Sequence, residues 1–119
     1  MGVVFRSGTS GLIENLFRRG ACTGLSDTRL LDRFVSERDE AAFATLVARH
    51  GALVLSTCRG VLKDTDSAED AFQATFVLLF RRAASIRERD ALGAWLHRVA
   101  YRVALQARVG AVRRRAVEM

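Results

Sequence analysis

Proline is absent from this 119-residue chain, and aromatic residues make up only 8% of it. Proline breaks helix interiors, so its absence leaves room for long helices. Alanine, leucine, arginine and glutamate are plentiful and are good helix formers. The length allows one hydrophobic core but not two. The sequence therefore predicts an all-α protein, a compact bundle of about four to five helices in one domain.

Cysteine is also scarce. Cys22 and Cys58 are the only two in the sequence and have no paired spacing, which argues against a disulfide framework and against a four-ligand zinc site. No uninterrupted apolar run reaches the roughly 18 residues of a membrane span. The N-terminus lacks the apolar region and small-residue cleavage site of a signal peptide. These absences predict a cytoplasmic protein with reduced thiols, no metal and no membrane.

Catalytic motifs are missing as well. The sequence contains no G-x-G-x-x-G, P-loop, H-E-x-x-H or nucleophile elbow. Its acidic residues lie mainly at predicted helix starts, where capping accounts for them. His50 falls on an apolar helical stripe with no cysteine or carboxylate constellation around it, so we expect a satisfied, partly buried histidine. The sequence predicts a binding module that is not an enzyme and needs no cofactor.

Positive charge is what the chain has in excess. Its formal net charge is +6. Many of its arginines lie towards the C-terminus: Arg98, Arg102, Arg108, Arg113, Arg114 and Arg115. A basic surface fits a polyanionic partner such as nucleic acid. It can also serve solubility alone.

The first 25 residues are predicted to form an N-terminal extension. Residues 1–11 are rich in glycine and serine and show no clear period, so we expect them to be loosely attached. Ser10 would cap a short amphipathic helix that ends at Gly20. This helix could lie on a membrane or a partner, but a helix laid over the domain is the simpler interpretation. We assign it no function.

Two further helices are expected after the extension. Ser26 or Asp27 opens one that ends near Glu37, and Asp39 caps a longer one over residues 40–62. Apolar residues recur along one side of each: Leu30, Leu31, Phe34 and Val35 in the first, and Phe43, Leu46, Val47, Leu53, Val54 and Val61, together with His50, in the second.

The stretch 66–80, DSAEDAFQATFVLLF, predicts the next helix. Asp66 followed by Glu69 is typical of an N-cap with a capping box. One side is an apolar stripe of Phe72, Phe76, Leu79 and Ala83, with Phe80 at its border. The other side mixes small, apolar and polar groups where a solvated face would be densely charged: Asp70, Gln73, Ala74, Val77 and Arg81. We expect this second face to dock on a partner.

A polar loop over residues 84–90 precedes the last predicted helix, which Asp90 caps. Its inner stripe is Leu92, Trp95, Leu96, Val99, Val103 and Ala107, and its opposite arc is Arg98, Tyr101, Arg102, Leu105 and Arg108. Trp95 is expected in the core, although it could also be a base-stacking wedge. Tyr101 is the better stacking candidate, or else a surface tyrosine that covers apolar neighbours.

These motifs carry a family resemblance. The run AEDAFQATF, followed by LGAWLHRVAYRVAL and a terminal arginine cluster, resembles region two of bacterial RNA polymerase sigma factors of the extracytoplasmic-function group, over residues 26–115. In that family the first motif docks on the clamp helices of the largest polymerase subunit. The resemblance implies that Asp70 and Gln73, flanked by Ala74 and Val77, contact core RNA polymerase. Ala74 departs from the glutamate that is often found at its position.

The resemblance also implies a role at promoter DNA. In the family, the loop before the last helix captures an unstacked base of the minus-ten element, and the helix holds the duplex edge and the freed strand. The matching loop positions are Ser85, Ile86 and Arg87, and the helix positions are Arg98 and Arg102. Together with Arg108, these helix arginines could pair with phosphates, and Tyr101 could stack on a base. The implied function is transcription initiation.

Several alternatives stay open. Sigma factors of this group normally continue into region four, so the sequence would be a fragment or a form that works with region two alone. Residues 116–119 are a predicted tail, and Arg113 to Arg115 would be a DNA clamp or a solvated segment. A general nucleic-acid-binding protein is one rival function. A non-initiating protein that occupies the sigma site on polymerase, or that titrates an anti-sigma partner, is another.

Overall fold

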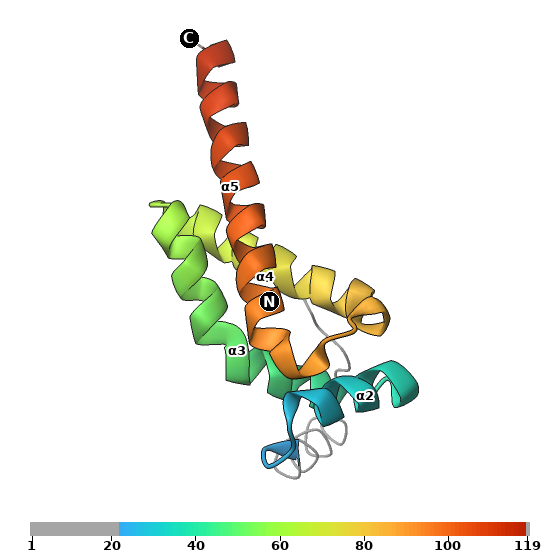
Figure 1. Cartoon of the computed structure of the whole chain (residues 1–119). Helices are drawn as coiled ribbons and strands as arrows, with labels where there is room; N and C mark the ends of the chain where they lie inside the picture. Colours follow the sequence, from blue (N-terminus) through green and yellow to red (C-terminus); the bar gives the residue numbers. More distant parts are fainter. Residues whose placement is uncertain (1–21, 119) are drawn as a thin grey trace, which may run out of the picture.

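The computed structural model describes residues 22–118, and this part of the chain is all-α, as predicted (Figure 1). Its α-helices and short 3-10 turns are α2 (Asp27–Glu37), α3 (Glu40–Val61), α4 (Thr65–Arg82), η1 (Ala83–Ser85), η2 (Arg89–Ala91) and α5 (Leu92–Glu118). The predicted helix from Ser10 to Gly20 lies outside the described residues, as does most of the predicted extension.

Helix α3 is the central element of the bundle. It packs against α2, α4 and α5, and α4 in turn packs against α5. Figure 1 shows α5 running from this core out past the other helices, so that its last turns project from the bundle. Val109, Val112 and Val117 on those turns are exposed.

Three phenylalanine rings join α2, α3 and α4, two of them buried in the core and Phe80 partly buried at its edge. The ring of Phe34 lies 4.9 Å from that of Phe43 and 5.1 Å from that of Phe80, centroid to centroid. Phe43 meets Phe80 edge-on at 5.5 Å. Such tilted and edge-on pairs add to the stabilisation that comes from burying apolar surface. The cluster fixes the ends of α2 and α4 relative to each other.

Two predicted helix starts are confirmed. The hydroxyl of Ser26 accepts a hydrogen bond from the backbone N–H of Arg29 at the start of α2. A carboxylate oxygen of Asp39 accepts hydrogen bonds from the N–H groups of Ala41 and Ala42, at 3.0 and 3.3 Å, at the start of α3. These contacts satisfy amides that a helix start leaves without intrahelical partners.

The predicted start of α4 is wrong by two residues. The cap is Asp64, whose carboxylate accepts a hydrogen bond from the N–H of Ser67 at 2.9 Å and another from its hydroxyl at 2.7 Å. These bonds to Ser67 hold the pKa of Asp64 below its usual range. Asp66 instead lies exposed in the first turn, where its charge complements the helix dipole.

Asp90 is likewise not the residue that precedes the last helix. It lies inside the turn η2, and α5 begins at Leu92. The predicted polar surface loop before it is also partly buried, because Ile86 is only 6% exposed and belongs to the core. The burial of Ile86 was not predicted, because the charged residues Arg87, Glu88 and Arg89 follow it directly.

The predicted core stripes are largely confirmed, with one exception on α3. Leu53 is 43% exposed, whereas Phe43, Leu46 and Val54 are fully buried. Two threonines, Thr45 and Thr75, are buried although their polarity argued against it. Each donates its hydroxyl hydrogen to the carbonyl four residues earlier at 2.8 Å, so both hydroxyls are satisfied.

Both cysteines are free and buried. Burial raises the pKa of the Cys58 thiol. Of the described helices, α3 alone is long and apolar enough to cross a membrane by length and composition. Core helices meet the same criterion, and the contacts of α3 with three neighbouring helices account for its apolar character here.

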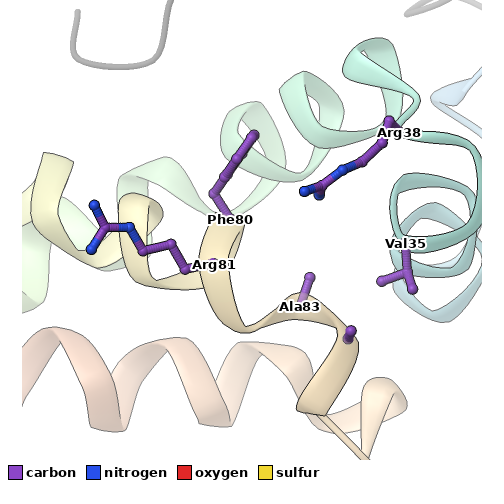
Figure 2. A pocket seen from close by; sticks show the side chains of 6 residues that line it. Val35, Arg38, Phe80, Arg81 and Ala83 are labelled. Atoms are coloured by element: carbon purple, nitrogen blue, oxygen red, sulfur yellow. The ribbon is translucent and has the colours of Figure 1, made fainter.

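Helix α2 ends at Glu37, and the next residue, Arg38, whose side chain is drawn in Figure 2, has an unusual backbone conformation. Arg38 has a φ of 53° and a ψ of 42°, and its N–H donates to the carbonyl of Phe34 at 2.9 Å. Glycine is the residue that normally occupies this left-handed position after a helix. The guanidinium of Arg38 packs over the rings of Phe34 and Phe80, at 4.9 and 5.2 Å from their centroids.

Candidate functional site

The outer side of α4 carries the predicted docking residues, and we call Asp70, Gln73, Ala74 and Val77 the α4 face. Asp70 is exposed, and the other three are partly exposed. The opposite side of α4 is buried through Ala68, Ala71, Thr75, Phe76 and Leu79. Because positions three and four apart share one side of a helix, the four residues form a continuous strip. This strip combines one charge with small and apolar groups.

A cavity of about 410 Å³ lies between the α4–α5 connection and the first turns of α5. We call it the connector pocket, and its lining is Ser85, Ile86, Arg87, Glu88, Ala91, Trp95 and Arg98. The three predicted loop residues are therefore brought together with one arginine of the last helix. Ser85 and Arg87 are exposed, whereas Ile86 reaches the pocket from the core. Trp95 is half-buried and packs against the core as well as lining the pocket.

Sequence reasoning missed the residue that holds this connection in place. Arg89 forms an ion pair with Asp32 on α2, and its Nε donates to the backbone carbonyl of Ile86 at 3.1 Å. Asp32 and Arg89 are 57 residues apart, so no local pattern pairs them. One side chain thus fastens the wall of the connector pocket to α2.

The outer side of α5 bears the predicted basic residues, and we call Arg98, Tyr101, Arg102 and Arg108 the α5 arc. All four are exposed, and the side chain of Tyr101 is 49% accessible. The inner side is buried at Leu92, Leu96, Val99, Ala100 and Ala104. The last two of these were not predicted, because alanine is too weak a hydrophobic signal. Arg98 belongs both to the arc and to the connector pocket.

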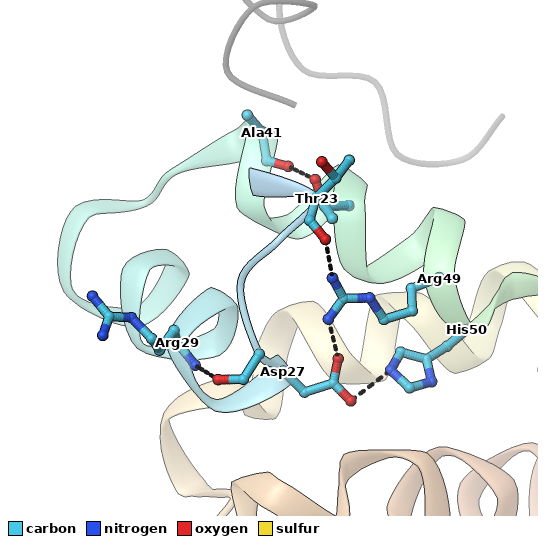
Figure 3. Close-up of polar contacts among 8 residues, drawn as sticks. Thr23, Asp27, Arg29, Ala41, Arg49 and His50 are labelled. Carbon is cyan, nitrogen blue, oxygen red and sulfur yellow. Dashed lines mark hydrogen bonds and ion pairs between the residues drawn. The ribbon is translucent and has the colours of Figure 1, made fainter. Parts of the chain in front are cut away.

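His50 is satisfied and partly buried, as predicted (Figure 3). Its Nε2 lies 2.9 Å from a carboxylate oxygen of Asp27, and its side chain is 13% exposed. The other oxygen of Asp27 accepts from Arg49, which also donates to the carbonyl of Thr23 at 3.1 Å. This network joins the start of α2 to α3. Within residues 22–118, no three His, Cys, Asp or Glu side chains are grouped to hold a metal ion.

The candidate surfaces differ in their chemistry. The α4 face offers a carboxylate, an amide and apolar groups, which suit a protein surface. The α5 arc offers guanidinium groups and one aromatic ring, which suit a nucleic acid strand. The connector pocket provides a hollow with an aromatic wall and arginines at the near end of the arc.

Comparison with known proteins identifies the family. Residues 46–116, more than half of the chain, match the family model described as Sigma-70 region 2. That span includes the α4 face, the connector pocket and the α5 arc. No curated protein and no solved structure gave a significant match. The chain therefore belongs to the sigma-70 region 2 family of transcription-initiation domains.

Proposed function

We propose that this protein is a sigma-factor region-two module of the extracytoplasmic-function group. It acts in the cytoplasm, binds core RNA polymerase, and recognises and melts the promoter minus-ten element. The observation that carries the proposal is that one bundle, matched to the family over residues 46–116, exposes an α4 face and an α5 arc of unlike chemistry. Residues 26–115 form the functional domain.

The α4 face is the proposed contact with the clamp helices of the largest polymerase subunit. Asp70 would pair with a basic group, and Gln73 would hydrogen-bond at the same surface. Ala74 and Val77 are partly exposed and would lose the rest of their apolar surface to the partner. With alanine at position 74, this contact is apolar where many family members offer an acid.

The connector pocket is the proposed site for an unstacked base. Ser85 and Arg87 offer polar groups at its exposed side, Ile86 provides an apolar floor, and Trp95 an aromatic wall. Extruding a base costs a few kcal/mol, and stacking returns about 1 to 3 kcal/mol per base. Binding energy in this pocket can therefore drive local melting without a catalytic step.

The α5 arc is the proposed track for the DNA backbone. Arg98 and Arg102 lie four residues apart and therefore on one side of the helix, where they can follow successive phosphates. Arg108 extends the same track, and Tyr101 is placed to stack on a base between the arginines. An anti-sigma protein that covers either surface would be a regulator of this function.

Run-off transcription tests both surfaces at once. Core polymerase is given templates with randomised minus-ten elements, and we expect transcripts only when the protein is added. Asp70→Arg, or Arg98→Ala together with Arg102→Ala, should abolish them. DNA binding that is equally tight without core enzyme, and without transcripts, would favour a general nucleic-acid-binding protein. Core binding without transcripts would favour a non-initiating interaction protein, and either result contradicts the proposal.

A further inference from the structure

A second cavity lies where α2 and α4 end, separate from the connector pocket (Figure 2). Its volume is about 470 Å³, and we call it the arginine pocket. Its lining residues are Val35, Arg38, Phe80, Arg81, Ala83 and Ala84. The floor is thus aliphatic and aromatic, and both polar side chains in the lining are arginines.

The backbone conformation at Arg38 indicates that the arginine side chain has a role at this position. Within residues 22–118, Arg38 is the only residue other than glycine with a positive φ. Glycine adopts this conformation without steric cost, whereas for arginine the same conformation is sterically strained. Strained residues of this kind are often found at functional sites. What arginine adds here is a guanidinium that is packed over the rings of Phe34 and Phe80.

Within residues 22–118, the charge of the arginine pocket has no carboxylate partner. In the described part of the chain, neither Arg38 nor Arg81 forms an ion pair, whereas Arg33, Arg49 and Arg89 each have a carboxylate partner. None of the six lining residues is acidic. The pocket therefore offers two positive charges above an apolar floor. A guanidinium that is already held against aromatic rings loses less freedom when it binds an anion.

The position of Arg81 connects this pocket to the α4 face. Arg81 follows Val77 by four residues and Ala74 by seven, so it continues the same side of α4. In Figure 2 Phe80 extends from α4 away from the ribbon of α5, Arg38 reaches towards it from the end of α2, and Arg81 extends from α4 on the other side of Phe80. A protein docked on the α4 face would therefore reach the pocket.

We propose that the arginine pocket binds an acidic side chain of the same polymerase surface that docks on the α4 face. The carboxylate would pair with the guanidinium of Arg38 beside Phe80, and its methylene groups would contact that ring. The exposed side chain of Arg81 would turn towards the carboxylate from the other side of Phe80. Arginine pairs with carboxylates through two parallel hydrogen bonds, which gives directional recognition. This inference rests on the proposed function, and it extends the polymerase contact from α4 to the end of α2.

Two substitutions test the pocket without disturbing the fold. Arg38→Gly removes the guanidinium and places glycine at a φ that glycine tolerates. Arg81→Ala removes the second charge from an exposed helix position. Arg82→Ala is the matched control, because Arg82 is exposed at the same helix end but does not line the pocket. The dissociation constants for core polymerase and for single-stranded DNA, and the unfolding temperature, are measured for each variant.

Arg38→Gly and Arg81→Ala should each bind core polymerase about tenfold more weakly, a loss of about 1.4 kcal/mol. Arg82→Ala should change this affinity by less than about twofold. The affinity of all three for single-stranded DNA should decrease slightly and equally, because each loses one positive charge. If Arg38→Gly also lowers the unfolding temperature, the affinity of Arg81→Ala for core polymerase decides whether the pocket is part of the interface.

The failures of the two proposals are distinguishable. If Asp70→Arg abolishes core binding while both pocket variants bind normally, the proposed function stands and the arginine pocket is not part of the interface. If the pocket variants bind core polymerase normally but lose more affinity for single-stranded DNA than Arg82→Ala does, the pocket binds a phosphate group and the inference is wrong. If the unmodified protein does not bind core, the proposed function and this inference fail together.

Discussion

The α4 face and the α5 arc are two outer sides of one bundle, and they differ in what they offer. The α4 face has one charged residue, Asp70, beside three partly exposed neighbours. The α5 arc has three exposed arginines and an exposed tyrosine. In the proposed function, docking on the first would bury apolar surface, a contribution that salt affects little. Nucleic acid bound to the second would release counterions, so its affinity would decrease steeply with salt.

One small domain has room for two surfaces of unlike chemistry. Each helix needs only its inner side for the core, so the outer sides of α4 and α5 are independent of each other. The connector pocket is different, because its shape depends on the ion pair between Arg89 and Asp32. Helical periodicity in the sequence predicts the two helix surfaces, whereas the pocket depends on contacts between segments that are distant in the sequence.

The largest expected effect is on the α4 face. Asp70→Arg should weaken binding to core polymerase by more than about 100-fold, because it replaces an attraction with a repulsion at an interface. Its affinity for single-stranded DNA should not decrease. Co-elution with core enzyme and a titration with labelled oligonucleotide measure the two affinities. Asp90→Arg, with the same charge change at an exposed position in η2, is the control and should still co-elute.

A change in the α5 arc should have the opposite selectivity. Arg98→Ala with Arg102→Ala should reduce affinity for a single strand on the order of tenfold and flatten the salt slope by about 1.4, at about 0.7 per phosphate contact. Core binding should be unchanged. The control is Arg29→Ala with Arg59→Ala, which removes the same charge from exposed positions on α2 and α3. Its single-strand affinity should keep most of its dependence on salt. Equal slopes in the two double variants would refute specific contacts by the arc.

A smaller effect is expected at the connector pocket. Arg89→Ala should weaken single-strand binding about threefold, since a partly exposed ion pair contributes up to about 1 kcal/mol. Because Arg89 acts through Asp32, the double variant with Asp32→Ala should be no weaker than Arg89→Ala alone. Arg33→Ala, which breaks an ion pair with Asp39 away from the connection, is the control. An equal loss in this control would mean that Arg89 has no role of its own.

The smallest effect concerns the start of α4 and affects stability alone. Asp64→Ala should lower the unfolding temperature at neutral pH more than Asp66→Ala does, because Asp64 is the cap. Hydrogen bonds from Ser67 lower the pKa of folded Asp64, so its contribution is present above the usual Asp range and is lost as the pH falls through the folded pKa. Thermal unfolding at neutral and acidic pH measures this. A difference that persists in acid would contradict the carboxylate cap.

The sequence predicted the parts of the fold that depend on local pattern. The caps at Ser26 and Asp39 and most of the buried stripes are confirmed, because capping and helical periodicity act over a few residues. At the start of α4 the acids Asp64 and Asp66 compete, and the hydroxyl of Ser67 selects the first. Leu53 was misplaced because periodicity does not show where the neighbouring helices end.

The candidate site was predictable to the same extent. The α4 face and the α5 arc lie on the surface sides that the pattern indicated, except that Leu105, predicted on the outer arc, packs against the core. The pairing of Arg89 with Asp32 and the stacking of Arg38 on two rings depend on segments that meet only in the folded chain. The left-handed backbone at Arg38 carried no signal, since glycine marks such positions and arginine does not.

In the proposed function the α4 face and the α5 arc act together, and a ternary binding measurement tests this in one experiment. A labelled single strand with a minus-ten element is mixed with core polymerase and the protein, and the strand that elutes with core enzyme is measured. The unmodified protein should carry the strand to the enzyme. Asp70→Arg should retain only the DNA, and the Arg98→Ala and Arg102→Ala double variant only the enzyme. Loss of both partners in either variant, or competition between the partners for the unmodified protein, would contradict the account.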